Sequence, residues 1–186
     1  MKYIFLDFDG VINNWYQMEG VSLENVKILK QIIDLTNASV IATTSNKYSF
    51  QQRGIDYYKS IFYKNYVIPL KELGIEITDV TPFINSSKIL EIKDYIESHK
   101  IEDYVILDDE LIEDSELQKH QVLPDLYLGL QPHHVEPIIN ILNGNLVFYP
   151  PNYNLNETVE EQAIRINDYH NKYTKNTQIS SRNWNL

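Results

Sequence analysis

Two aspartates separated by one residue stand at the end of the first apolar run of the chain. The run covers residues 3–6, and Asp7, Phe8, Asp9 and Gly10 follow directly. An apolar run of this length predicts a buried strand, and the glycine predicts a turn just beyond it. Open α/β sheets bind their ligands at the carboxyl ends of such strands. Two carboxylates there suit a Mg²⁺ ion bound through oxygen and an aspartate that acts as a nucleophile.

A second pair of carboxylates follows another apolar run. Residues 104–107 read Tyr-Val-Ile-Leu, which predicts a strand, and Asp108 and Asp109 come directly after it. Adjacent buried carboxylates repel each other, and such a pair at the end of a strand usually needs a cation nearby. We therefore expect a cation close to these two aspartates.

Three hydroxyl residues in a row stand at the end of the strand predicted over residues 39–43, namely Thr43, Thr44 and Ser45. The apolar run ends at Ala42, which favours Thr43 as the residue that faces the site and leaves Thr44 as the alternative. Taken alone, the cluster is typical of a turn that caps a helix. Its place in the chain, between the two acidic motifs, makes it a candidate for the same site.

A lysine begins a later predicted helix. Lys88 is followed one turn later by Glu91, and apolar side chains at helical spacing continue beyond both. A cation beside a reacting carboxylate stabilises negative charge, whereas a lone lysine at the start of a helix is usually only solvated. Lys88 is favoured by its order along the chain and by the glutamate that follows it. Lys71 and Lys93 are weaker candidates.

The elements that must position these residues alternate between strands and helices. Strands are predicted at 3–7, 39–43, 75–81, 104–107 and 126–128, and helices at 23–36, 48–63, 88–98 and 132–142. This alternation predicts βαβ crossovers and a mainly parallel sheet covered on both faces. The composition changes after Asn143 and becomes rich in asparagine. We therefore expect one α/β domain over residues 1–143 and an appendage over residues 144–186 with one amphipathic helix.

Composition narrows the class of protein further. The chain has 186 residues, no cysteine, 43% hydrophobic residues and a net charge of −10. It has no apolar run of about 20 residues that would cross a membrane, and its start does not resemble a signal peptide. We expect a cytoplasmic protein without disulfides. A negative charge of this size disfavours non-specific binding to nucleic acid, which depends on lysine and arginine.

These motifs together resemble the haloacid dehalogenase (HAD) superfamily of phosphohydrolases. The run from Asp7 to Val11 matches the first motif of that family, DxDG(V/T), and the hydroxyl cluster, Lys88 and the second acidic pair follow in the family's order. The closest resemblance is to the small uncapped HAD domains of Swiss-army-knife RNA repair proteins. It is carried by the runs IFLDFDGVIN, Lys-x-x-Glu-Ile, YVILDDE and LGLQPHHVEPIINIL, and it covers about residues 1–143.

The resemblance implies a chemistry for the acidic residues. Asp7 would be the nucleophile that forms an aspartyl-phosphate, and Asp9 would be the general acid and then the general base. Mg²⁺ would be bound by Asp7, by the backbone carbonyl of Asp9 and by Asp109, with Asp108 as the second acidic residue. An aspartate at position 9 favours phosphatase activity over dehalogenase or ATPase activity.

The resemblance also implies which residues surround the phosphoryl group. Lys88 and Thr43 would contact it directly, and the further residues expected to bind substrate are Gly10, Thr44 and Ser45. The family often has Trp-Arg after its second motif, where this chain has Ser45-Asn46-Lys47. A substrate contact made by that arginine therefore does not carry over directly.

The implied fold is a HAD-like, Rossmann-like three-layer α/β/α sandwich with a mainly parallel sheet, no large cap and a C-terminal helical appendage. An uncapped site suits a phosphorylated nucleotide or nucleic-acid end, and the alternative is a phosphorylated small metabolite. A third hypothesis is a non-catalytic interaction module that keeps the fold. Such a module would not need Asp7, Asp9, Lys88 and Asp109 together. No membrane contact is expected, and the C-terminal segment could support an oligomer.

Overall fold

The computed structural model describes residues 1–14, 20–47 and 60–146, together with residues 158, 160, 161, 164 and 168. The chain divides into two compact units, Met1–Pro151 and Asn152–Leu186. In the second unit, residues 160, 161, 164 and 168 are helical, so the C-terminal part contains a helix. In the described part of the chain, no helix is both long and apolar enough to cross a membrane.

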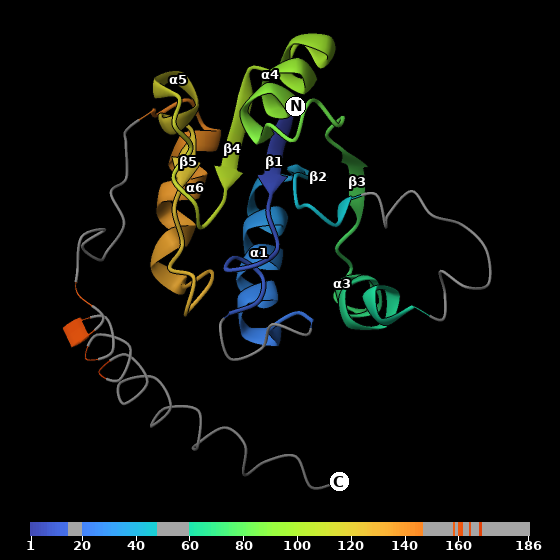
Figure 1. Cartoon of the computed structure of the whole chain (residues 1–186), viewed down its shortest axis with the longest axis vertical. Coiled ribbons are helices and arrows are strands. Elements are labelled where there is room, and N and C mark those ends of the chain that lie inside the picture. Colours follow the sequence, from blue (N-terminus) through green and yellow to red (C-terminus); the bar gives the residue numbers. More distant parts are fainter. Residues whose placement is uncertain are drawn as a thin grey trace, which may run out of the picture. The chain divides into compact units, whose positions relative to one another are not determined.

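The first unit is built on a five-stranded sheet in which every strand pairs in parallel with its neighbours (Figure 1). The strand order is β3-β2-β1-β4-β5, so the first strand of the chain lies in the centre. The strands are β1 (Lys2–Leu6), β2 (Ser39–Ala42), β3 (Ile77–Val80), β4 (Asp103–Leu107) and β5 (Gln121–Val122). A parallel sheet brings all carboxyl ends to one edge, which is where the chemically active residues of the sequence are found.

The register of the three central strands places their following residues at one level. Leu6 pairs with Ala42 of β2 and with Leu107 of β4. Beyond this level the backbone N–H of Asp7 still donates to Leu107, at 2.9 Å, and that of Thr43 donates to Leu6, also at 2.9 Å. Backbone hydrogen bonds therefore hold the first residues after β1 and β2 against the ends of the neighbouring strands.

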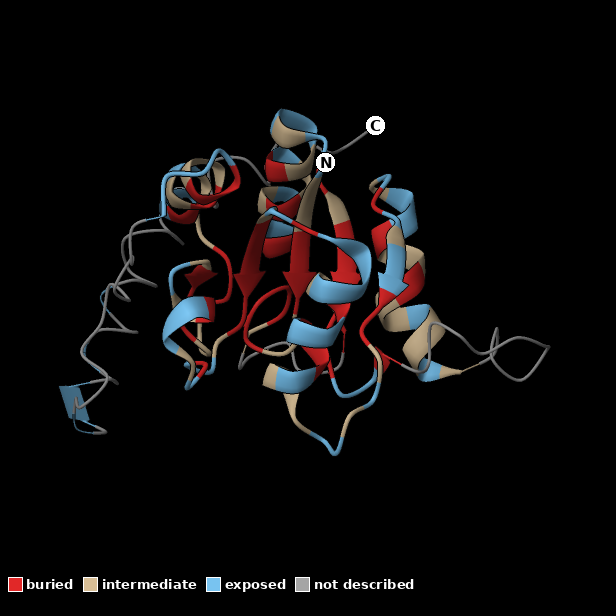
Figure 2. Ribbon diagram, turned by 90° about the horizontal axis from the view of Figure 1, so that it is seen from above, coloured by how far each residue is buried: buried red, intermediate tan, exposed pale blue. Residues whose placement is uncertain are grey.

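Helices cover both faces of the sheet. In Figure 2 the strands between them are mostly red, the colour of buried residues. Alternate strand residues point to opposite faces: Leu6 packs in one apolar cluster and Phe5 in the other. The first cluster includes residues of α1 (Leu23–Thr36), α3 (Ile68–Glu72) and α6 (Val135–Leu142), and the second includes residues of α4 (Lys88–His99) and α5 (Ser115–Gln118). Two short non-α turns precede α3 and α6, namely the π-helix η2 (Tyr63–Val67) and the 3₁₀ helix η3 (Pro132–His134). The predicted three-layer α/β/α fold is confirmed.

One predicted strand is wrong. Residues 126–128 form a turn, and the edge strand beside β4 is β5 instead. The turn is closed by Asp125, whose side chain accepts the N–H of Tyr127 at 2.7 Å and whose carbonyl accepts the N–H of Gly129, also at 2.7 Å. An aspartate that binds the backbone two residues on favours a turn over a strand, despite the apolar side chains that follow. Of the helix predicted over 48–63, residues 48–59 lie outside the described residues.

Gly129 ends this turn and packs against the loop that follows β1. Its φ is +64°, and a Cβ atom there would lie 2.6 Å from the carbonyl oxygen of Asn13 and 2.8 Å from that of Val11. The N–H of Leu130 donates to the same Val11 carbonyl at 2.8 Å. The turn therefore packs directly against the Asp7–Asn13 loop. This close approach requires that position 129 has no side chain.

We expect Gly129→Ala to destabilise the protein by more than the cost of a positive φ alone, which is about 1–2 kcal/mol. The excess comes from the clash with the two backbone carbonyls. The free energy of unfolding in urea measures it. Gly144→Ala is the matched control, because Gly144 also has a positive φ, +83°, but no described atom lies within 4 Å of its Cβ position. Equal losses in the two variants would contradict the proposed close packing at Gly129.

Candidate active site

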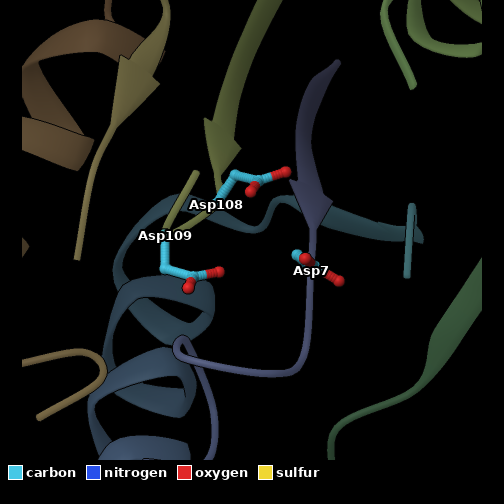
Figure 3. A group of neighbouring side chains, drawn as sticks. All are labelled: Asp7, Asp108 and Asp109. Carbon is cyan, nitrogen blue, oxygen red and sulfur yellow. The ribbon is translucent and has the colours of Figure 1, made fainter. Parts of the chain in front are cut away.

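Three carboxylates converge at the carboxyl ends of β1 and β4. Asp7 follows β1, Asp108 and Asp109 follow β4, and one oxygen from each lies within 4.8 Å of the others. Figure 3 shows the three side chains around one small space at the ends of these strands. Asp108 is fully buried, whereas Asp7 and Asp109 are partly exposed. The two acidic motifs of the sequence therefore form one cluster.

Lys88 supplies a positive charge to this cluster from the first turn of α4. Its Nζ donates to Asp7 Oδ2 at 2.9 Å and to Asp108 Oδ2 at 2.6 Å. The helix begins after Ser87, whose side chain accepts the N–H of Leu90, and this cap fixes where the lysine leaves the helix. Burial by itself would lower the pKa of Lys88, but the charges of Asp7 and Asp108 outweigh it and raise that pKa well above the ordinary value. The lysine is therefore a permanent cation.

One lysine does not balance three carboxylates. Burial raises the pKa of Asp108 to about 6 even though Lys88 opposes the shift. Burial, followed by the charges of Asp108 and Asp7, raises the pKa of Asp109 to about 7. Both shifts express the cost of crowding negative charge in a partly dry site. A cluster of hard oxygen donors with excess negative charge fits a divalent cation such as Mg²⁺, with Asp7, Asp108 and Asp109 in reach of it.

Gly10 allows Asp109 to approach the loop after β1. Its φ is +67°, and a Cβ there would lie 2.5 Å from Asp109 Cγ. Any side chain at this position would push the Asp109 carboxylate away from Asp7. The predicted role of Gly10 in substrate binding stays a prediction. The close approach of Asp109 and the positive φ are separate reasons for a glycine at this position.

The hydroxyl cluster after β2 separates into two kinds of residue. Thr43 Oγ1 is buried and finds no hydrogen-bond partner among the described residues. Thr44 Oγ1 instead accepts the backbone N–H of Asn46 at 3.4 Å within a local turn, and Ser45 is exposed. An unsatisfied buried hydroxyl is costly unless a ligand binds it. Thr43 therefore carries the hydroxyl that has no partner, and its predicted contact with a phosphoryl oxygen stays a prediction.

Asp9 lies outside the cluster of three carboxylates described above. Its Oδ1 accepts a hydrogen bond from Asn13 Nδ2 at 2.7 Å. The structure thus gives the two aspartates of the first motif different surroundings: Asp7 is paired with a lysine, and Asp9 with a neutral amide.

A buried ion pair beside the site was not foreseen from the sequence. Lys47 Nζ binds Glu91 Oε2 and donates to Thr81 Oγ1 at 3.1 Å, and both charged side chains are nearly fully buried. Glu91 Oε1 also accepts the N–H of Ile84 at 3.2 Å. The pair ties the loops after β2 and β3 to the first turn of α4, which carries Lys88. The sequence signal was the run Ser45-Asn46-Lys47, which stands where the family often has Trp-Arg.

A comparison with protein families finds one match over most of the chain. A family described as "HAD domain in Swiss Army Knife RNA repair proteins" matches residues 3–135. No curated protein matches the chain, and no solved structure matches it. The matched residues include both acidic motifs, the hydroxyl cluster and Lys88.

We expect Glu91→Leu to destabilise the protein by about 3–5 kcal/mol, because it leaves the Lys47 ammonium buried without its partner charge. The double variant Lys47→Met/Glu91→Leu should regain most of that loss. Urea unfolding measures both. Lys30→Met is the control: it removes an exposed pair with Asp34 on α1 and should cost less than about 1 kcal/mol. A double variant no more stable than Glu91→Leu would show that the pair itself stabilises the fold.

The raised pKa of Asp109 predicts a pH dependence of stability when no divalent cation is present. Its pKa rises from an ordinary 3.8 to about 7 on folding, so the stability it contributes is complete below pH 4 and is lost as the pH rises through 7. Asp109→Asn should therefore be more stable than the wild type at pH 8, by about 1 kcal/mol after allowance for solvent screening.

The difference between Asp109→Asn and the wild type should shrink towards zero near pH 4, where both side chains are neutral. Urea unfolding in the presence of a chelator at pH 4, 6 and 8 tests this. Asp34→Asn, on the exposed side of α1, is the control for loss of a carboxylate as such. An Asp109→Asn protein that is less stable than the wild type at pH 8 would contradict the charge crowding described above.

Proposed function

This chain belongs to the family of HAD domains found in Swiss Army Knife RNA repair proteins, and we propose that it is a Mg²⁺-dependent phosphatase that works through an aspartyl-phosphate. Membership makes it a HAD-type hydrolase in general. The observation that carries the proposal is the position of Asp7. It is bound to Lys88, it lies within reach of Asp109, and the residue before it accepts the backbone N–H of Thr43.

The proposed reaction has two steps on a phosphate monoester. In the first, a carboxylate oxygen of Asp7 forms a bond to phosphorus while the bond from phosphorus to the leaving oxygen breaks. The carboxyl proton of Asp9 passes to that leaving oxygen. In the second, a water oxygen attacks phosphorus, its proton passes to Asp9, and the bond to Asp7 breaks. The products are an alcohol and inorganic phosphate, and both aspartates return to their first state.

The surrounding residues stabilise the charge that moves in these steps. Lys88 lies against Asp7 and would neutralise a phosphoryl oxygen, and the Thr43 hydroxyl would donate to another. Mg²⁺, held by Asp7, by the backbone carbonyl of Asp9 and by Asp109 with Asp108 nearby, would supply the charge that lets an anionic nucleophile approach a phosphate. The raised pKa of Asp109 is consistent with such a cation.

The family and the part of the chain before β2 support a proposal for the substrate class. In the described residues between Gly10 and Thr43, α1 is the one helix and there is no strand before β2, so this part holds no large cap. The lack of a large cap in these described residues suits a substrate that is the end of a long molecule. Since the family is named for RNA repair proteins, we propose a nucleotide or polynucleotide-end phosphate as the substrate.

One observation favours a small phosphorylated metabolite as the second candidate. A cavity of about 230 Å³ beside Lys88 is lined by Glu110 and Glu113 as well as by Asp108. Carboxylates there repel a polyanion, as does the net charge of −10. They accept a neutral or cationic leaving group instead.

We expect phosphate release that requires Mg²⁺, measured on p-nitrophenyl phosphate, nucleoside monophosphates, and 3′- and 5′-phosphorylated oligonucleotides. Asp7→Asn should abolish release from all of them, because an amide does not form the aspartyl-phosphate. Asp9→Asn should lose about 10²-fold or more on substrates with poor leaving groups. Asp34→Asn, an exposed carboxylate on α1, should keep full activity.

The substrate panel decides between the two candidate classes. Fastest release from an oligonucleotide end supports the end-processing role, and fastest release from a small substrate supports the metabolite role. Undiminished release by Asp7→Asn would refute the nucleophile. Absence of release from every substrate, with Mg²⁺ stabilising the protein in thermal unfolding, would refute the proposed substrate classes.

A further inference from the structure

Asn13 is a buried polar residue in the loop after β1 with no role in the chemistry described so far. Its side chain is 1% exposed. Its Oδ1 accepts the backbone N–H of Gly10 at 2.8 Å, and its Nδ2 donates to Asp9 Oδ1 at 2.7 Å. The residue therefore links the backbone of the first motif to the side chain of Asp9.

The hydrogen bond from Gly10 determines which way the amide of Asn13 points. A backbone N–H only donates, so it must face the carbonyl oxygen of the amide rather than its NH₂ group. The NH₂ group is then directed at Asp9, and its nitrogen lies 3.5 Å from the hydroxyl of Tyr66. Asp9 Oδ1 thus receives a donor whose orientation is set by the main chain.

Tyr66 closes the far side of this arrangement. It belongs to the π-helix η2, and its ring stacks on Phe8 with centroids 5.6 Å apart and on Phe62 with centroids 5.2 Å apart. Burial and the nearby negative charge of Asp9 raise the pKa of its hydroxyl, so it stays a neutral group. An aromatic wall of this kind limits how far Asn13 and Asp9 can rotate.

We propose that Asn13 is a positioning residue that orients Asp9 for proton transfer to the leaving oxygen. The inference rests on the proposed phosphatase function. Asp9 Oδ1 accepts a hydrogen bond from a group that cannot accept a proton in return. Oδ1 is therefore occupied by the amide, and Oδ2 is the oxygen left for proton transfer to the leaving group. Holding the acid in this orientation lowers the entropy lost on reaching the transition state.

The proposal predicts an effect that depends on the leaving group. An alkoxide leaving group needs the proton from Asp9 as its bond to phosphorus breaks, whereas p-nitrophenolate leaves readily without it. Loss of a positioning residue for the acid should therefore slow alkyl phosphates much more than aryl phosphates. A residue that only supports the fold would slow both alike.

The test compares Asn13→Asp with the wild type on p-nitrophenyl phosphate and on glycerol phosphate, with Mg²⁺ present. Aspartate has the same shape and still accepts the N–H of Gly10, but it has no N–H to donate to Asp9. We expect kcat/KM for glycerol phosphate to fall about 10-fold or more, and kcat/KM for p-nitrophenyl phosphate to fall less than about threefold. Asn14→Asp is the matched control, since the amide of Asn14 points at Asn25.

Two further variants keep the outcome interpretable. Asn13→Ser introduces no charge and removes the amide that reaches Asp9, so it should show the same preference. Placed in an Asp9→Asn protein, Asn13→Ser should cost nothing more on glycerol phosphate, because the residue acts through Asp9. Equal losses on the two substrates, or an undiminished cost without Asp9, would overturn the proposal. A wild-type protein inactive on every phosphate would instead overturn the proposed function itself.

Discussion

Crowding of negative charge at the ends of β1 and β4 is the constraint on which the rest of this structure depends. Asp7, Asp108 and Asp109 lie close enough to repel one another, and Lys88 compensates only part of their charge. Such an arrangement opposes folding, so it persists only where the surrounding structure holds it. The parallel register of the central strands, the cap of α4 and the missing side chain at Gly10 all act in that direction.

Two sets of interactions hold the acidic cluster in place. Backbone hydrogen bonds place Asp7 and Thr43 directly after their strands. A second set of buried polar groups then joins the segments around the site. Lys47 binds Glu91, and Asn13 accepts the backbone N–H of Gly10. Each of these groups is hydrogen-bonded within the protein, whereas the buried Thr43 hydroxyl has no partner among the described residues.

The chemical residues were predictable from the sequence, because short motifs at strand ends encode both their type and their place. Asp7, Asp108, Asp109 and Lys88 are brought together as the motifs predict, and helices such as α1 follow the apolar spacing. What the sequence did not reveal depends on contacts between distant segments. Lys47 and Glu91 meet across 44 positions. The turn closed by Asp125 was also missed, because a short apolar run hides a local side-chain hydrogen bond.

The two ends of the sheet have a consequence for how copies of this protein can meet. The edge strands are β3, with four residues and a shift of register against β2, and β5, with two residues. Short or irregular edges offer few unpaired backbone groups to a strand from another molecule. Continuous sheets between folded copies, and the fibrous aggregates that grow from them, are therefore disfavoured by the architecture itself.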